Sequence, residues 1–231
     1  MVKMVTYGRK KMKKYIKDLK IFLLQNFKWI ILFFSIVFFL ILLEDVMDKD
    51  IMTIDTKGYT FVSTYLISDF TIPIAKTITN LGGAYWLIGI SICLLLLIKN
   101  KKVGISVLLN LILASLTNYI LKQILQRPRP IEYRIIDENG YSLPSGHSMV
   151  SMAFYGYLIY LIYRHINNKY IKWSLITLLS LLIISIGISR IYLGVHYTSD
   201  VLAGFLVAIS YLIIYINIIN RIIENKENRK V

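Results

Sequence analysis

Long apolar runs with few charged residues recur along this chain, and they constrain its fold more than any other feature. The 231 residues are 56% hydrophobic and 17% charged, with a mean hydropathy of +0.61, whereas about a quarter of the residues are charged in an ordinary soluble domain. A helix needs about 20 apolar residues to cross a bilayer. Runs near this length are residues 21–43, 77–98, 103–121, 141–163, 173–189 and 201–220. The sequence therefore predicts an all-α protein, an integral membrane bundle of six transmembrane helices.

These runs predict one membrane domain, residues 21–220, between a basic N-terminal arm, residues 1–20, and a basic tail, residues 221–231. No Pro- or Ser-rich linker divides the domain. Residues 44–58 are acidic and lack a helical period, so we expect an exposed loop there. Residues 59–76 mix apolar and hydroxyl side chains around a proline. This pattern favours a short interfacial amphipathic segment between the first two spans, with a packed loop as the alternative.

Positive charge gathers on one side of the predicted topology. The formal net charge is +14, and Lys and Arg cluster in residues 3–28, 99–102, 164–172 and 221–230. The opposite side carries most of the acidic residues, together with fewer cations. The positive-inside rule then places both termini in the cytoplasm, and the first helix is expected to be an uncleaved anchor because no small-residue cleavage site follows it. We interpret the basic arm as a topology signal that also contacts membrane lipids, and we expect no nucleic-acid partner.

Three short polar blocks stand at the ends of the apolar runs in the second half of the chain. They are Lys122-x6-Arg129-Pro130, Pro144-Ser145-Gly146-His147 and Ser189-Arg190-x5-His196-x3-Asp200. The predicted topology places all three on the extracytoplasmic side, although they are far apart in sequence. They combine three cations, a helix start with free N–H groups, and two imidazoles, one of which has a carboxylate four residues later. Phosphoryl transfer requires groups of these kinds.

In this order and at these spacings, the blocks resemble the three signature motifs of the type 2 phosphatidic acid phosphatase superfamily, and they match at every defining position. The resemblance covers residues 122–200 directly and, through the six-helix layout, most of the chain. It implies a membrane enzyme that hydrolyses a lipid phosphate or diphosphate, such as phosphatidic acid, phosphatidylglycerophosphate or undecaprenyl diphosphate. These motifs contact the phosphoryl group that such lipids share, so they do not distinguish the tails.

His196 and Asp200 are four residues apart at an expected helix start. They can share one face of the helix, where the carboxylate accepts a hydrogen bond from one ring nitrogen and leaves the other as a nucleophile. We assign His196 to attack on phosphorus, and the resemblance likewise implies a phosphohistidine intermediate. Taken alone, the pair favours a helix-capping Asp beside an interfacial His.

His147 follows Ser145 and Gly146 near the opening of a helix. There it can protonate the leaving alkoxide and later help to activate water, because an imidazole has an intrinsic pKa of about 6.5. The Pro-Ser-Gly turn predicts an N-cap whose backbone N–H groups face an anion. An ordinary N-cap would explain Ser145 but not the imidazole beside it.

Lys122, Arg129 and Arg190 are the cations expected to bind the nonbridging phosphate oxygens and to stabilise their charge in the transition state. Arginine suits forked contacts, whereas lysine acts as a point charge. Arg127 and Arg134 flank the first block outside its defining positions. We interpret these two as interfacial or substrate-access charges.

Glu132, Asp137 and Glu138 lie near the first two blocks in sequence and have side chains that could bind a metal ion. The chain has no pair of histidines at metal-ligand spacing, and the expected pocket already holds cations where a two-metal phosphatase places its ions. The sequence therefore predicts no metal and no other cofactor.

The predicted enzyme resides in the cytoplasmic membrane with its active site on the extracytoplasmic face, and no obligate protein partner is evident. Three other functions remain open. A phosphotransferase of the same superfamily would use an acceptor other than water. A non-catalytic lipid-phosphate binder or transporter would not require both His147 and His196. A vanadate-dependent haloperoxidase resembles the same pocket, but that branch is typically soluble, which the apolar runs argue against.

Overall fold

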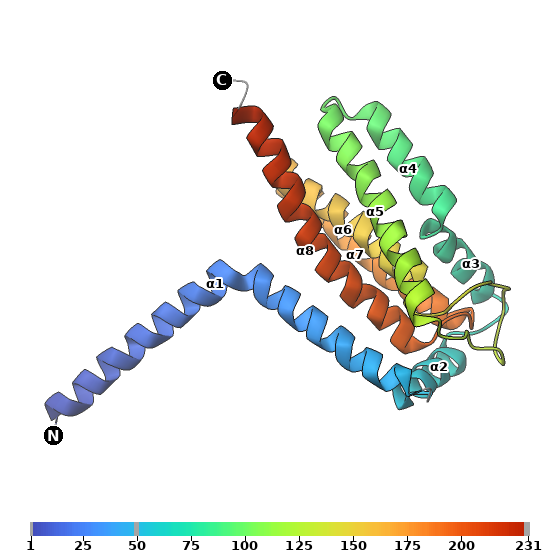
Figure 1. Cartoon of the computed structure of the whole chain (residues 1–231), viewed down its shortest axis with the longest axis horizontal. Helices are drawn as coiled ribbons and strands as arrows, with labels where there is room; N and C mark the ends of the chain where they lie inside the picture. Colours follow the sequence, from blue (N-terminus) through green and yellow to red (C-terminus); the bar gives the residue numbers. More distant parts are fainter. Residues whose placement is uncertain (1, 49–50, 229–231) are drawn as a thin grey trace.

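The structure is a computed structural model that describes residues 2–48 and 51–228, with the side chains of residues 17, 18, 20–48 and 51–222. Within these residues it contains helices and no strand, which confirms the all-α prediction (Figure 1). Its eight helices are α1 (Val2–Met47), α2 (Thr53–Tyr65), α3 (Thr71–Leu81), α4 (Ala84–Leu97), α5 (Lys101–Leu125), α6 (Gly146–His165), α7 (Lys169–Tyr192) and α8 (Thr198–Asn228). Most of the basic side chains assigned to the arm and the tail, together with Lys49 and Asp50, lie outside the described part.

In the part of the chain that the structure describes, four helical segments are long and apolar enough to cross a membrane. They are Lys20–Met47, Lys101–Leu125, Lys169–Tyr192 and Thr198–Ile222. The pair α3 and α4 qualifies as a fifth span only when its halves are taken together. The remaining expected span, residues 141–163, is represented by α6, which packs against α5, α7 and α8 at the centre of the bundle. Because α6 faces other helices, it carries buried serines that a lipid-facing span would avoid. The chain is thus a multi-pass membrane protein, but the count of six is not confirmed.

The span predicted for residues 77–98 is broken at Gly82 and Gly83, where α3 meets α4 at an angle of 48°. A Cβ on Gly82 would lie 2.6 Å from Cγ2 of Ile186 in α7. The glycine therefore allows α3 to approach α7 at the point where the chain changes direction. The apolar run of residues 77–98 predicts one continuous span, because the apolar neighbours of the two glycines hide the break.

The region between α1 and α4 differs from the expected loop and interfacial segment. The loop predicted for residues 44–58 is wrong in part, because α1 continues to Met47 and α2 begins at Thr53. Asp55 in this region is buried, not exposed. Pro73 lies in the first turn of α3, where the missing N–H removes no intrahelical hydrogen bond. An interfacial position for residues 59–76 is not confirmed.

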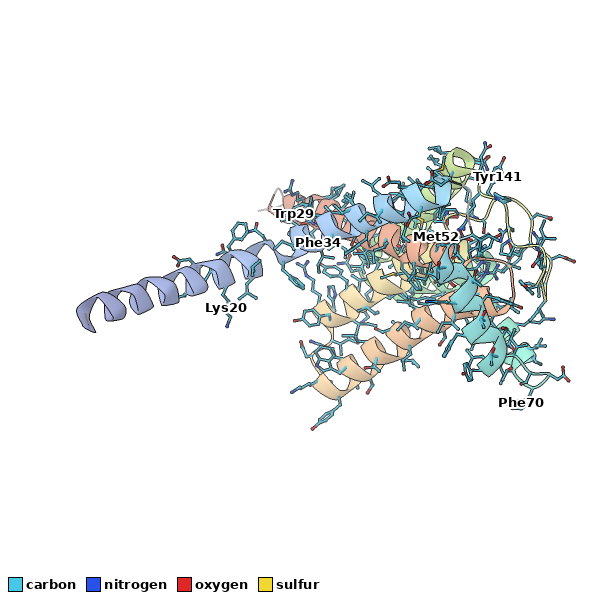
Figure 2. The ribbon with its side chains drawn as sticks, turned by 90° about the horizontal axis from the view of Figure 1, so that it is seen from below. Lys20, Trp29, Phe34, Met52, Phe70 and Tyr141 are labelled. Carbon is cyan, nitrogen blue, oxygen red and sulfur yellow. The ribbon has the colours of Figure 1, made fainter. Side chains whose placement is uncertain are left out.

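The second half of α1 packs on α8, and Nζ of Lys28 donates to Oδ1 of Asn217 at 2.6 Å. A bend between the labelled Lys20 and Phe34 separates this part from the N-terminal part, which projects away from the bundle (Figure 2). At the opposite end of the bundle lie α2, the start of α8 and the loop of residues 126–145 (Figure 1). This end holds the three polar blocks.

Candidate active site

The three polar blocks meet in one cavity of about 290 Å³. Residues from each block line it, namely Lys122, Arg129, Gly146, His147 and His196, together with Glu138. Arg190 reaches the same place through its ion pair with Glu138. The structure therefore brings together groups that are more than 70 residues apart in sequence.

Lys122 lies in the last turn of α5, where a cation also interacts favourably with the helix dipole. The helix ends at Gln126, which adopts a left-handed conformation with φ 46° and turns the chain into the loop of residues 126–145. Nζ of Lys122 donates to the carbonyl oxygens of Tyr141 and Ser142. Lys122 thus holds the loop segment that precedes α6 against the end of α5.

The start of α6 has the N-cap that the sequence predicted. The side chain of Ser145 accepts a hydrogen bond from the backbone N–H of Ser148 at 3.4 Å. A Cβ on Gly146 would lie 3.0 Å from Oδ1 of Asn118, so a glycine allows the first turn to pack closely against α5. His147 in this turn lines the cavity beside the free N–H groups of the helix start.

His196 lies in the short connection between α7 and α8. The turn requires Gly194, whose φ is +68°, because a Cβ there would lie 2.0 Å from the carbonyl oxygen of Tyr133. Backbone N–H of Ile135 also donates to the carbonyl of Leu193 at 3.0 Å. The loop of residues 126–145 is therefore fastened to the connection that carries His196.

Asp200 contacts His196 and caps α8 at the same time. Its Oδ2 lies 3.5 Å from Nδ1 of His196 and accepts the backbone N–H of Tyr197 at 2.8 Å. The hydroxyl of Ser142 donates to the same oxygen and lies 3.3 Å from Nδ1 of His196. The carboxylate of Asp200 thus caps α8, as expected for a helix-capping Asp. It also faces the imidazole of His196, as expected for a catalytic pair.

The other ring nitrogen of His196, Nε2, lies 3.0 Å from a guanidinium nitrogen of Arg129. Burial, with smaller contributions from the charges of Arg129 and Arg190, lowers the pKa of His196 from 6.5 to about 4, although the hydrogen bond and charge of Asp200 oppose the shift. The imidazole is therefore neutral at neutral pH. When the carboxylate of Asp200 accepts a hydrogen bond from Nδ1–H of His196, the lone pair of the ring lies on Nε2, which faces Arg129.

Glu138 is bound by two of the cations assigned to the substrate phosphate. Its Oε1 lies 2.5 Å from a nitrogen of Arg190 and its Oε2 lies 3.4 Å from a nitrogen of Arg129. Burial by itself would raise the pKa of Glu138, but the ion pairs, led by Arg190, outweigh it and the pKa is lowered. Nε of Arg190 is buried and has no hydrogen-bond partner within the described part of the chain. Arg190 thus has a hydrogen-bond donor that Glu138 does not satisfy.

Several neighbours of the site were not assigned to it from the sequence. Ser142 contacts both His196 and Asp200, and Thr79 of α3 accepts from Arg190 at 2.7 Å. Arg127 was interpreted as an interfacial or substrate-access charge, but it is buried in ion pairs with Asp55 and Asp200. The Arg-Pro pair at residues 127 and 128 repeats that of the first block and could have indicated that Arg127 belongs near the site. No pattern in the sequence around Asp55 indicates that this residue is buried there.

The three acidic residues that could bind a metal ion according to the sequence do not lie together in the structure. Glu132 and Asp137 are exposed, while Glu138 faces the arginines. Among the side chains that the structure describes, no three of His, Cys, Asp or Glu lie close enough to hold a metal ion. Activity without a metal remains a prediction.

Comparison with known proteins places the chain in a family. The profile of the PAP2 superfamily, the type 2 phosphatidic acid phosphatases, matches residues 103–224, which are more than half of the chain. Phosphatidylglycerophosphatase B of Bacillus subtilis is 32% identical over 133 residues, which cover 55% of this chain and 65% of that protein. Dolichyldiphosphatase 1 of Dictyostelium discoideum is 28% identical over 139 residues, which cover 58% of this chain and 60% of that protein. Each alignment thus spans less than two thirds of the relative.

The fold is also similar to a solved structure. The crystal structure of a transmembrane PAP2-type phosphatidylglycerolphosphate phosphatase from Bacillus subtilis superposes with a TM-score of 0.72 at 24% identity, covering 83% of this chain and 96% of that one. The likeness in fold extends beyond the residues that the family profile matches.

Proposed function

Because the chain belongs to the PAP2 superfamily, we propose that it is a membrane phosphatase that hydrolyses a lipid phosphate or diphosphate through a phosphohistidine. The observation that carries the proposal is the position of His196. Its neutral imidazole faces a cavity lined by Lys122, Arg129 and His147, and Asp200 lies behind it. A nucleophile with an orienting group on one side and cations on the other is the arrangement that phosphoryl transfer needs.

In the first step, Nε2 of His196 attacks phosphorus and the bond from phosphorus to the leaving oxygen breaks. His147, which the negative charge of the bound phosphate favours as the imidazolium, donates its proton to that oxygen, so that the lipid leaves as an alcohol, or as a monophosphate when the substrate is a diphosphate. In the second step, His147 accepts a proton from water, whose oxygen attacks the phosphohistidine. Inorganic phosphate leaves, and both histidines return to their starting states.

Lys122, Arg129 and Arg190 stabilise the negative charge on the nonbridging oxygens during both steps. The backbone N–H of Gly146, in the first turn of α6, adds a dipole at the same place. The backbone N–H of Ser145, which the sequence also assigned to the phosphate, donates to the carbonyl of Asp200 at 3.0 Å and is therefore not available to it. An incoming phosphate would displace the carboxylate of Glu138 from the arginines and would satisfy the buried Nε of Arg190.

The wall of the cavity supports a lipid as the substrate. On the side of α4 and α5 it is lined by Leu87, Ile88 and Leu111, and Ile88 is 46% exposed on the outer surface of the bundle. A phosphate at headgroup depth can thus reach His196 while its tail stays in the membrane. Phosphatidic acid, phosphatidylglycerophosphate and undecaprenyl diphosphate all meet this requirement.

For the placement in the cell, we propose that residues 21–220 form the membrane domain, with residues 1–20 and 221–231 in the cytoplasm. Positive charge in the connection between α6 and α7 supports this orientation. The active site, at the opposite end of α6, then opens on the extracytoplasmic face of the cytoplasmic membrane.

The test is an assay of the purified protein in detergent against a panel of lipid phosphates and diphosphates, scoring inorganic phosphate. We expect release by the wild type and none above background by His196→Ala that remains monodisperse. Acid-labile, base-stable labelling of the wild type by a radioactive phosphoryl group would report the phosphohistidine. Wild-type-like release by His196→Ala would overturn the mechanism, while transfer to an alcohol without release of phosphate would favour a phosphotransferase.

A further inference from the structure

Asp200 is fully buried, and both of its carboxylate oxygens are engaged. Oδ2 faces His196, as described above. Oδ1 lies 2.7 Å from a guanidinium nitrogen of Arg127, a residue outside the signature motifs. A buried carboxylate that must hold an imidazole in one orientation requires its own position to be fixed.

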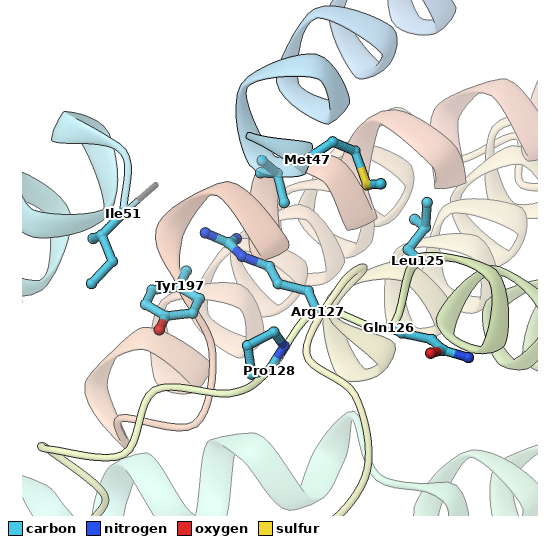
Figure 3. A pocket seen from close by; sticks show the side chains of 8 residues that line it. Met47, Ile51, Leu125, Gln126, Arg127, Pro128 and Tyr197 are labelled. Carbon is cyan, nitrogen blue, oxygen red and sulfur yellow. The ribbon is translucent and has the colours of Figure 1, made fainter. Parts of the chain in front are cut away.

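Arg127 bridges Asp200 to a second buried carboxylate, that of Asp55. One guanidinium nitrogen contacts Asp200 and also Oγ of Ser199 at 2.7 Å, and the other lies 2.9 Å from Oδ2 of Asp55. Figure 3 shows the side chain of Arg127 extending from the loop after α5 toward Tyr197, and the guanidinium stacks on this ring at 4.2 Å from its centroid. The guanidinium is thus fixed by contacts on several sides.

Asp55 belongs to α2, which lies outside the residues matched by the family profile. Its Oδ1 accepts the backbone N–H of Ser199 at 2.8 Å, so Asp55 also caps α8. Next to it, a Cβ on Gly58 would lie 2.1 Å from Oγ1 of Thr198. The glycine permits the close approach of α2 to the turn that carries the catalytic pair.

The charges along this row alternate as carboxylate, guanidinium and carboxylate. Removal of one member leaves a buried charge without its partner, which is strongly unfavourable. The position of Asp200, and through it the position of His196, therefore depends on the two charges behind it.

We propose that Asp55 and Arg127 are positioning residues that fix Asp200 behind His196 and thereby give α2 a role in the phosphoryl-transfer step. This inference rests on the proposed function, because it assigns a task to groups that touch neither substrate nor phosphorus. The simpler alternative is that the pair only anchors α2 to the bundle.

The two possibilities differ in kinetics. If the pair orients the nucleophile, Asp55→Asn and Arg127→Met should lower kcat by about 10²-fold, the cost of a displacement of about 1 Å, while KM stays within about twofold of wild type. Arg127→Lys should recover part of the loss, since a single point charge can still reach one carboxylate. Asp69→Asn, which removes an exposed carboxylate between α2 and α3, is the matched control and should leave kcat unchanged.

The positioning role and the anchoring role also predict different pKa changes at His196. Histidine NMR measures this pKa without any substrate. The charged or titratable groups that act on this imidazole are Asp200, Arg129, Arg190 and His147. In Asp55→Asn, Arg127 is left to neutralise Asp200 alone, so the pKa of His196 should fall. In Arg127→Met, two carboxylates are left without the guanidinium, so the pKa of His196 should rise. A pair that only anchors α2 gives no such opposite shifts.

The experiment combines both measurements on variants that elute as monodisperse protein in detergent. Lower kcat at unchanged KM together with opposite shifts in the His196 titration supports the positioning role. Wild-type kcat in Asp55→Asn and Arg127→Lys, or shifts of the same sign, would overturn it. If the wild type releases no phosphate from any lipid, the proposed function fails, whereas the NMR arm still decides whether the pair acts on His196.

Discussion

The carboxylate of Glu138 lies 2.5 Å from the guanidinium of Arg190, at the place where the proposed mechanism needs a phosphate oxygen. The loop of residues 126–145 thus carries an anion into the proposed phosphate site. If Arg190 binds the phosphoryl group, as proposed, the substrate competes with this carboxylate for the same guanidinium.

Replacement of Glu138 by Gln should therefore tighten the binding of phosphate-like anions. We expect inorganic phosphate or orthovanadate to inhibit Glu138→Gln about 10-fold more strongly, which is the order expected for the loss of one competing charge-assisted hydrogen bond. Inhibition constants measured beside Glu132→Gln, which neutralises an exposed neighbour in the same loop, would check this. Equal inhibition constants in the wild type and Glu138→Gln would contradict competition.

The role of His147 as the general acid predicts a dependence on the leaving group. His147→Ala should lose roughly 10²- to 10⁴-fold in turnover of a lipid phosphate, the usual contribution of general acid–base catalysis. A phenyl phosphate with an electron-withdrawing substituent should recover part of the loss, because its leaving oxygen needs less protonation. The same loss with good and poor leaving groups would remove His147 from this role. His165→Ala, at the end of α6 remote from the cavity, serves as the control.

The lowered pKa of His196 predicts that this imidazole stays neutral well below pH 6.5. In NMR spectra of selectively labelled histidine, assigned with His147→Asn and His165→Asn, the resonance of His196 should titrate near pH 4. Between about 4 and 6.5 the unfolded chain binds a proton that the folded chain does not, so this residue makes the fold less stable as the pH falls through that window. Titration near 6.5 would show that burial and Arg129 do not control the nucleophile.

Activity should survive excess EDTA, because Lys122, Arg129 and Arg190 supply the positive charge that metal ions supply in two-metal phosphatases. The measurement is phosphate release before and after chelation and dialysis. Complete loss on chelation that is restored by Mg²⁺ or Mn²⁺ would contradict the proposed pocket and would direct attention to Glu132, Asp137 and Glu138.

The sequence predicted the helical fold and the meeting of the motif residues because both depend on local signals. An apolar run predicts a helix, and a polar block at its end predicts a position near one membrane face. Lys122, Arg129, His147 and His196 line one cavity as these signals indicated. The contact of His196 with Asp200 was also predicted, but His196 lies in the connection before α8 begins at Thr198, so the two residues do not share a helix face.

The remaining features depend on contacts that the sequence does not record. Asp55 lies 72 residues from Arg127 in the chain, and its burial follows from the docking of α2 onto α8. Thr79 and Ser142 act in the site only through α3 and the loop before α6. The break at Gly82 could not be predicted for the same reason, because it depends on the close approach of Ile186 of α7.

The orientation of the site in the membrane can be tested with single cysteines in a Cys93→Ser background. Asp137 and Asn139 lie in the exposed part of the loop beside the site, and Asn168 lies in the exposed connection between α6 and α7 at the other end. If the positive-inside bias sets the topology, Asp137→Cys and Asn139→Cys should react with a membrane-impermeant thiol reagent added to intact cells, whereas Asn168→Cys should react only after permeabilisation. The enzyme would then act on lipids of the outer leaflet, which suits the recycling of a carrier lipid phosphate after its cargo has been delivered outside. The opposite labelling pattern would place the site on the cytoplasmic leaflet and would make lipid phosphates synthesised inside the cell the better substrates.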